Sequence, residues 1–467
     1  MGNLFSTVAL VSWPIISLLL YMKRPLPQAT MWTVLAAQML LPVGALIKFQ
    51  MIPQFDKETI PCLCILVGCM VVARRPLKLL HGRGLADLLI IMSIASPILT
   101  SELNGDTITL IDRVLPGVGL YDAISAVEYG TILLIPFFVG RQFFRSPSSS
   151  KQIMLVLTVA GLLYSIPLLF EIRFSPQLHY WVYGFYPTDF LQSVRDGGFR
   201  PMAFMGHGLL AALYVMMSAV AAATLWRSGT SLFSFRSSVI TGYLALLMIV
   251  CKSAGATIYT FTLIPLIKWM TPNFQARVAV VLVLVALLYP ALSVLKLFPS
   301  DAILQLASGF SEDRAQSLQV RFDNEAILLD HALERPIFGW GRYGRNRVYD
   351  TESGKDDSIT DGQWIIVLGG FGLFGFVAQF GLLAIGVFRA ASALKFAEST
   401  NEKIFFSALC LIVAVNILDL LPNSGLRPWT WLLAGALLGR AEQLQTFSKR
   451  VDRSVGLSME ARPGVFY

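Results

Sequence analysis

The sequence predicts an all-α protein, a polytopic transmembrane helical bundle of about 11 to 13 helices with two large loops on one side. Three observations predict this fold. Of the 467 residues, 55% are hydrophobic and only 14% are charged, whereas soluble domains are nearer to a quarter charged. Apolar runs of about 20 residues, enough to span a bilayer, recur along the whole chain. Basic residues gather in alternate connections between these runs, which is typical of the cytoplasmic side of a membrane protein.

The apolar runs give the order of the expected helices. Candidate spans lie near 4–22, 30–47, 60–75, 85–100, 119–139, 152–170, 207–226, 237–251, 254–270, 276–297, 362–388, 404–421 and 427–440. The stretch 237–270 is either two short spans or one broken span, and the last span is short. The first run has no charged side chain in residues 1–6 and no clear cleavage site, so we expect a membrane helix there and not a cleaved signal peptide.

Basic residues orient the predicted bundle. The connections expected on the cytoplasmic side, with the C-terminal tail, contain Lys23, Arg24, Arg74, Arg75, Lys78, Arg83, Arg141, Arg145, Lys151, Arg227, Arg236, Arg389, Lys395, Lys403, Lys449, Arg450, Arg453 and Arg462. The other side receives the N-terminus and the loops 171–206 and 299–361, the second of which is rich in Asp and Glu. The positive-inside rule therefore predicts a multi-pass inner-membrane protein with both loops in the periplasm.

These signals divide the chain into six segments. We expect N-terminal transmembrane helices (1–170), a first periplasmic loop (171–206), central transmembrane helices (207–298), a large periplasmic loop with short helices (299–361), C-terminal transmembrane helices (362–440) and a cytoplasmic tail (441–467).

The composition argues against several classes of function. All five cysteines fall in apolar stretches without a CxxC pair, and the four histidines lack HExxH spacing, so we expect no disulfide framework and no metal site. The net charge of +8 lies in loops between apolar spans, and no nucleic-acid-binding motif accompanies it. The sequence has no DxD motif and no Walker A motif, and we expect no nucleotide or other cofactor.

The first loop combines aromatic and basic side chains. Arg195 and Arg200 flank the pair Gly197–Gly198, which allows tight backbone turns. Arginine binds phosphate with two parallel hydrogen bonds, and aromatic rings stack on sugars. We therefore consider Arg195, Arg200 and Tyr183 candidate substrate ligands. The alternative is an amphipathic loop at the membrane interface whose arginines pair with nearby acids. Its aromatic residues are Tyr180, Trp181, Tyr183, Phe185 and Tyr186.

The second loop ends in a glycine-rich basic turn. A helix near 302–318 and another near 321–333 are expected before Pro336. The following segment interleaves glycines with Arg342 and Arg345, and exposed backbone amides beside guanidinium groups suit an anion such as pyrophosphate. The alternative is a loop with solvated charges. The glycines of this turn are Gly339, Gly341 and Gly344.

Two further polar residues lie at the ends of apolar runs. Asp361 precedes a glycine-rich span, where its carboxylate could accept a proton or orient an acceptor hydroxyl, although Asp is also a common helix N-cap. Lys252 lies between two apolar runs, and a lysine in such a place either reaches an interface or serves a site. Glycines after Asp361 would let neighbouring helices approach closely.

In their order and spacing, these residues resemble the O-antigen ligase and polymerase superfamily of bacterial envelope glycosyltransferases (the Wzy/WaaL type). That family has an Arg at the start of a loop helix, then Pro-x-x-Gly-x-Gly, then a polar residue at the membrane edge, then Gly-x-x-Gly in the next helix. The first loop's Arg-Pro, at residues 200–201 just before a helix, is also similar. The corresponding residues across 315–376 are Arg321, Pro336, Gly339, Gly341, Asp361, Gly372 and Gly375.

One position departs from the family pattern. The ligases have a His followed by Ser or Asn where this sequence has Asp361 followed by Gly362. The departure favours a polymerase-like or exopolysaccharide-assembly member over a lipid A-core ligase.

The resemblance implies a metal-independent glycosyl transfer at the periplasmic face of a bacterial inner membrane. The donor would be an oligosaccharide on undecaprenyl pyrophosphate, and an acceptor sugar hydroxyl would attack its anomeric carbon with help from Asp361. Arg195, Arg200 and Arg321 would neutralise the pyrophosphate, followed by Arg342 and Arg345. Implied partners are membrane lipids and a chain-length regulator or another polysaccharide assembly protein.

Two other functions fit a protein with this hydropathy. A lipid-linked glycan flippase or other exporter should place its charges in a cavity among the helices, whereas the charges here concentrate in two loops. A non-catalytic membrane subunit would not need arginines that converge from separate loops. The position of the two loops relative to each other is therefore the discriminating feature.

Overall fold

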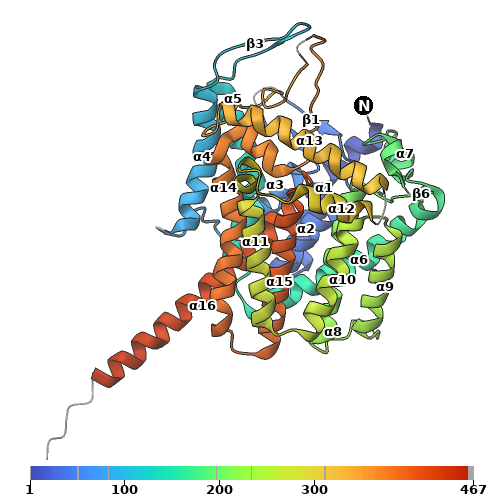
Figure 1. The fold of residues 1–467 in the computed structure, drawn as a ribbon. Helices are drawn as coiled ribbons and strands as arrows, with labels where there is room; N and C mark the ends of the chain where they lie inside the picture. Colours follow the sequence, from blue (N-terminus) through green and yellow to red (C-terminus); the bar gives the residue numbers. More distant parts are fainter. Residues whose placement is uncertain are drawn as a thin grey trace, which may run out of the picture.

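The computed structural model describes residues 2–49, 52–82, 84–195, 197–232, 234–309, 312–350 and 352–460. The chain forms a helical bundle (Figure 1). Its apolar helices are α1 (Leu4–Lys23), α2 (Leu26–Leu40), α3 (Thr59–Val67), α4 (Leu85–Glu102), α5 (Leu120–Phe143), α6 (Pro147–Phe174), α8 (Gly208–Arg227), α9 (Ser237–Val250), α10 (Ala254–Trp269), α11 (Pro272–Val294), α14 (Gln363–Ala393), α15 (Thr400–Asp419) and α16 (Pro428–Glu460).

The all-α prediction is confirmed. Eight helices within the described ranges are long and apolar enough to cross a membrane, namely α1, α4, α5, α6, α8, α11, α15 and α14 with the short 3₁₀ helix η3 (Leu394–Phe396) that follows it. The stretch 237–270 folds as two separate helices, α9 and α10, so the two-helix alternative is correct. Helix α3 is short and continues as a π-helix, η1 (Gly68–Val72).

Both predicted loops lie at one end of the bundle, together with the N-terminus (Figure 1). The first contains α7 (Leu178–Tyr183), the 3₁₀ helix η2 (Phe190–Ser193) and the hairpin of β5 (Val194–Arg195) and β6 (Gly198–Phe199). The second contains α12 (Ser300–Ser308) and α13 (Glu312–Glu334).

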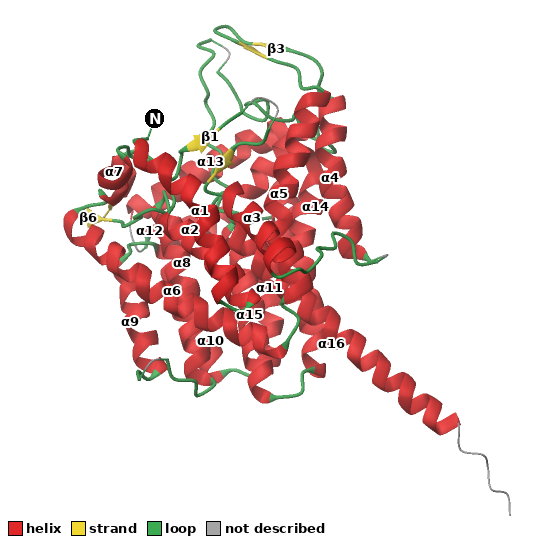
Figure 2. Ribbon diagram, turned by 180° about the vertical axis from the view of Figure 1, so that it is seen from behind, coloured by secondary structure: helices red, strands yellow, loops and turns green. Residues whose placement is uncertain are grey.

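Two further hairpins lie at this end, and the sequence did not predict them (Figure 2). One pairs β1 (Leu46–Ile47) with β2 (Phe55–Asp56), and the other pairs β3 (Ile108–Thr109) with β4 (Val114–Leu115).

The opposite end carries predicted cytoplasmic basic residues, and some of them hold helices together. Arg141 of α5 pairs with Asp87 of α4 at 2.6 Å and with Glu442 of α16 at 2.7 Å. Helix α16 runs well beyond the predicted span at 427–440 and extends away from the bundle (Figure 1). The expected tail from residue 441 is therefore helical as far as Glu460. Arg83 and Arg462 lie outside the described residues.

Candidate functional site

A buried carboxylate shapes the end of the first loop. Glu171 of α6 accepts hydrogen bonds from the backbone amides of Met202 at 2.9 Å and Ala203 at 2.6 Å. The Tyr164 hydroxyl donates to the Met202 carbonyl at 3.2 Å and accepts from the Phe204 amide at 3.0 Å. A carboxylate that accepts amide hydrogen bonds fixes local backbone strongly. The segment 200–207 therefore has a defined path over α6 and α8.

A buried lysine ties the same segment to the N-terminal helices. Lys57 donates from its ammonium group to the carbonyl oxygens of Leu41, at 2.9 Å, and Phe204, at 2.5 Å. Burial lowers the pKa of Lys57, while neighbouring Glu58 acts to raise it. The first loop is thus anchored from two sides.

Three of the predicted substrate ligands meet at the first loop. Arg200 donates from Nε and Nη2 to the carbonyl oxygen of Lys252, at 3.3 and 3.0 Å. The ammonium of Lys252 in turn donates to the carbonyl oxygen of Arg195 at 2.8 Å. Lys252 lies in the turn between α9 and α10, so it reaches this loop and not the opposite end of the bundle.

Arg200 also lies directly beside the start of α8. A Cβ atom added to Gly208 would be only 2.4 Å from the Cδ of Arg200, so the arginine stem packs on that glycine. The preceding residue, His207, caps α8, and its Nδ1 accepts from the amide of Leu209 at 3.2 Å. Arg200 and His207 therefore share one corner of the site.

Helix α13 of the second loop presents Arg321 to the start of α14. Arg321 Nε lies 3.3 Å from Asp361 Oδ2, and both side chains are partly exposed. One turn further along α13, Glu325 accepts from the Tyr289 hydroxyl at 2.6 Å and from Trp364 Nε1 at 3.2 Å. Burial raises the pKa of Glu325 above its ordinary value. Glu325 thus fixes α13 against α11 and α14, which positions Arg321.

Charged groups from both loops act on the pKa of His207. Burial lowers the pKa of His207 below its ordinary value, and surrounding positive charge lowers this pKa further. That charge comes from three separate segments of the chain, at Arg200, Arg321 and Arg427, while Asp361 acts in the opposite direction. We refer to these three arginines, with Asp361 and His207, as the arginine site.

Arg427 enters the arginine site from the short connection between α15 and α16. Its Nη1 donates to Glu58 Oε1 at 2.6 Å, and Glu58 Oε2 accepts from Gln38 Nε2 at 3.2 Å. Its Nε is buried and has no hydrogen-bond partner in the part of the chain that the structure describes. A buried guanidinium hydrogen without a partner is costly, so a bound acceptor there would be stabilised.

The glycine-rich turn of the second loop packs on a break in α14. The amides of Trp340 and Gly341 donate to the carbonyl oxygens of Gly369 and Gly370, each at 2.8 Å. Gly372 has a φ of 66° inside α14, which lets the turn approach. The amides that the sequence suggested for an anion are therefore used within the protein at these two residues.

The two arginines of this turn lie in different surroundings. Arg345 is 1% exposed and donates to the carbonyl oxygens of Trp340 and Pro116 and to both the carbonyl and the carboxylate of Asp106. Arg342 is partly exposed, with a buried Nη1 that the described residues leave without a partner. Arg342 thus has an unused donor, whereas Arg345 binds Asp106 and Pro116, which lie just before β3 and just after β4.

Tyr183, the remaining predicted ligand, is 4% exposed. Its hydroxyl donates to the carbonyl oxygen of Leu40, and its ring contacts that of His179 at a centroid distance of 5.1 Å. It therefore packs α7 against the end of α2. Exposed rings of the same loop are Tyr180 and Tyr186, stacked at 4.9 Å, and Trp181.

The sequence did not single out His207 as a site residue, nor Arg427, Glu58 or Asp419. Arg427 and Asp419 lie within or beside apolar spans, where hydropathy treats them as ends of helices. The signal available in the sequence was the Arg-Pro pair at 427–428, which repeats the Arg-Pro pair at 200–201.

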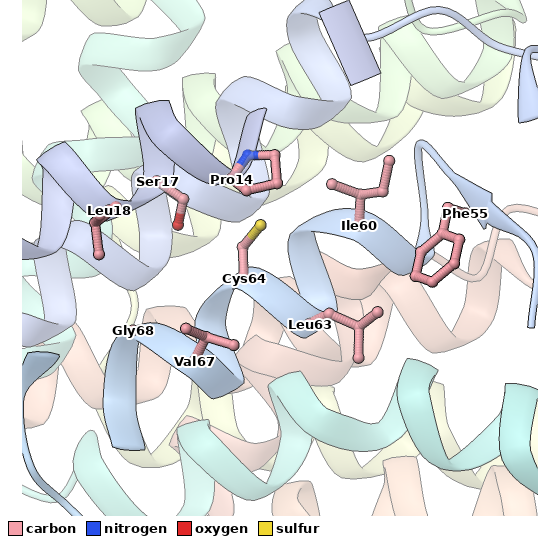
Figure 3. Close-up of a pocket in the computed structure, with 9 residues that line it drawn as sticks. All are labelled: Pro14, Ser17, Leu18, Phe55, Ile60, Leu63, Cys64, Val67 and Gly68. Carbon is pink, nitrogen blue, oxygen red and sulfur yellow. The ribbon is translucent and has the colours of Figure 1, made fainter. Parts of the chain in front are cut away.

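A surface pocket lies apart from these charges, between α1 and α3 (Figure 3). It has a volume of about 210 Å³ and is lined by Phe55, by α1 between Pro14 and Leu18, and by α3 and η1 between Ile60 and Gly68. None of its lining side chains is charged, so it suits a hydrocarbon chain and not an anion.

No protein-family model matches this sequence, and no curated protein matches it at a significant level. The geometry of the arginine site and the motifs of the sequence therefore carry the functional argument.

Proposed function

We propose that the protein is a glycosyltransferase that polymerises or ligates glycan units carried on undecaprenyl pyrophosphate. Its site would face the periplasm of a bacterial inner membrane. The observation that carries the proposal is a group of three arginines from separate chain segments at one end of an apolar bundle. Arg200 packs beside the start of α8, Arg321 pairs with Asp361, and the charges of both, with that of Arg427, act on the pKa of His207. Asp361 and Glu58 pair with Arg321 and Arg427, but the buried Nε of Arg427 has no hydrogen-bond partner among the described residues, and such a donor suits an anionic ligand.

A pyrophosphate fits this cluster chemically. Guanidinium groups bind phosphate oxygens with two parallel hydrogen bonds, and they stabilise the negative charge that develops when a phosphate departs. In the proposed reaction, an acceptor sugar hydroxyl attacks the anomeric carbon. The bond from that carbon to the pyrophosphate oxygen breaks, and its electron pair stays on the pyrophosphate. Asp361, paired with Arg321, would orient that arginine toward the leaving group.

The surroundings of the arginine site support a lipid-linked sugar donor. Asp361 lies two residues before Gln363, the first residue of α14, so the site would lie near a headgroup whose hydrocarbon chain is in the bilayer. Exposed rings on the first loop, Tyr180, Trp181 and Tyr186, offer stacking surfaces for sugars. The positive-inside rule supports the periplasmic side for both loops.

The proposal can be tested by complementation of a deletion strain with Arg200→Ala, Arg321→Ala and Arg427→Ala. Arg113→Ala is the matched control, because Arg113 is an exposed arginine at the same end of the bundle. Its only ion-pair partner among the described residues is Asp112. We expect the three site variants to reach normal membrane abundance, to lose long polysaccharide and to accumulate short lipid-linked units. The control should restore full-length polymer.

Other outcomes of the complementation experiment would favour other functions. Long polymer that stays on its lipid carrier would favour a ligase over a polymerase. Full-length, correctly attached polymer from all three site variants would refute the pyrophosphate assignment. Lipid-linked units confined to the cytoplasmic leaflet would favour the flippase.

A further inference from the structure

Asp419 lies beside the arginine site, and the mechanism above gives it no role. It is the last residue of α15. Asn423 Nδ2 donates to Asp419 Oδ1 at 3.1 Å, and the amide of Asn423 donates to the carbonyl oxygen of Asp419 at 3.1 Å. The turn after α15 therefore holds this carboxylate in a fixed position.

Backbone hydrogen bonds join this turn to the chain that carries Asp361. The amide of Gln363 donates to the carbonyl oxygen of Leu420 at 2.9 Å and to that of Asn423 at 3.2 Å. Asp361 and Asp419 thus lie on two segments that are joined by backbone hydrogen bonds. Because Asp361 pairs with Arg321 at 3.3 Å, the turn that holds Asp419 is hydrogen-bonded to the segment that carries this ion pair.

The other carboxylates near the site are already occupied. Asp361 pairs with Arg321 and Glu58 pairs with Arg427. Both oxygens of Glu325 accept hydrogen bonds, from Tyr289 and Trp364. A carboxylate in an ion pair is a weaker proton acceptor, because the cation stabilises its charged form.

Asp419 differs from these three. Over the described residues, no arginine or lysine lies within ion-pair distance of it, and its side chain is partly exposed. Oδ1 accepts a hydrogen bond from Asn423. Oδ2 is not one of the buried polar atoms that lack a hydrogen-bond partner in the described residues. One oxygen is therefore held by Asn423, while no hydrogen bond from the described residues engages the other.

We propose that Asp419 is the general base of the glycosyl transfer, an inference that rests on the proposed function. Its Oδ2 takes the proton of the acceptor sugar hydroxyl as that oxygen forms its bond to the anomeric carbon. The bond between this carbon and the pyrophosphate oxygen breaks, and the electron pair leaves with the pyrophosphate, which the arginines hold. Release of the proton to water restores the carboxylate. The acceptor is thus a hydroxyl, which needs a base when it attacks.

The test uses the full-length protein in detergent with lipid-linked repeat units extracted from the deletion strain as donor and acceptor. Initial transfer rates are measured between pH 5.5 and 9 for the wild type, Asp419→Asn, Asp419→Glu and Asp361→Asn. A positioned general base typically contributes a factor of about 100 to 10,000. We expect Asp419→Asn to lower kcat about 100-fold or more with little change in donor KM, and to lose the fall in rate at low pH. Asp419→Glu should recover part of the rate and the acid limb of the profile.

Thermal unfolding of each purified variant separates a folding defect from a chemical one. If Asp419→Asn is unstable, the Asp419→Glu profile still decides, because a shifted acid limb supports the base and an unshifted one refutes it. Wild-type kcat and pH dependence in Asp419→Asn would overturn the inference while leaving the proposed function intact. No transfer by the wild-type protein would overturn both.

Discussion

Arg321 and Asp361 form an ion pair, with 3.3 Å between Nε and Oδ2, that joins helix α13 of the second loop to the start of α14. Both side chains are partly exposed, so the pair contributes little to stability, about 0–1 kcal/mol. Its main effect is on geometry, because it sets the direction of an arginine on a helix that Glu325, one turn away, fixes against α11 and α14.

We therefore predict that Asp361 acts through Arg321. Asp361→Asn should lower transfer about tenfold, and Arg321→Ala should lower it much further. The double variant should then be no worse than Arg321→Ala alone, because the partner that Asp361 orients is already missing. Transfer rates of the wild type, the two single variants and the double variant, each normalised to membrane abundance, complete this double-mutant cycle. Independent, multiplicative losses would instead give Asp361 a separate catalytic role.

A second prediction contrasts two arginines of one turn. Arg345→Ala should lower the thermal stability of the purified protein strongly, because removal of one partner from a buried charged network costs about 3–5 kcal/mol. Arg342→Ala should leave stability close to that of the wild type, since its Nη1 has no partner to lose within the described residues. Reduced transfer by a stable Arg342→Ala protein would make Arg342 a substrate ligand. Equal melting temperatures for Arg345→Ala and wild type would contradict the structural role of Arg345.

A third prediction concerns the break in α14. Gly372→Ala should reduce stability, because its φ of 66° alone costs a non-glycine residue about 1–3 kcal/mol. The added Cβ would also lie 2.3 Å from the backbone of Ile337. Gly370→Ala is the matched control, because its nearest neighbour would be 3.6 Å away. Melting temperatures in detergent test the pair, and equal losses in both variants would disprove the proposed contact.

The helices could be predicted because a bilayer leaves the backbone few choices. Every amide and carbonyl in hydrocarbon must be paired within the protein, so an apolar run of sufficient length becomes a helix. Each candidate span overlaps an apolar helix, but only eight of these helices within the described ranges are long and apolar enough to cross a membrane, fewer than the 11 to 13 expected. The candidate span 30–47 is also too long, because α2 ends at Leu40 and β1 begins at Leu46. The stretch 237–270 stayed ambiguous, since hydropathy does not distinguish a broken helix from a turn at Lys252. The extent of α16 was underestimated because its distal half is polar.

The candidate site was only partly accessible to sequence reasoning. Arg200, Arg321 and Asp361 were chosen from motifs, and the structure brings them together. Arg427 and Asp419 were missed because they flank a short connection, where a charged residue ordinarily marks the end of a span. Arg342 and Arg345 looked equivalent in the sequence, and only the chain on either side of the β3–β4 hairpin, at Asp106 and Pro116, makes Arg345 a buried side chain.

The position of His207 leads to a last prediction, about protons. Burial, and then the charges of the surrounding arginines, lower the pKa of His207 below its ordinary value, which favours the neutral imidazole in the free protein. A bound pyrophosphate would offset that positive charge and raise the pKa of His207. Binding would then take up a proton, and linkage requires that affinity strengthen as pH falls through the interval between the two pKa values.

Binding of inorganic pyrophosphate to the wild type and to His207→Asn, measured calorimetrically between pH 5 and 8, tests this linkage. Asn keeps the cap on α8, because its side chain also accepts from the first turn of a helix. The ligand changes its own charge over this range, so the ratio of the two dissociation constants is the informative quantity. The advantage of the wild type should grow as pH falls, by at most about tenfold per pH unit for a single proton. A ratio that does not vary with pH would show that His207 lies too far from the bound anion to sense it.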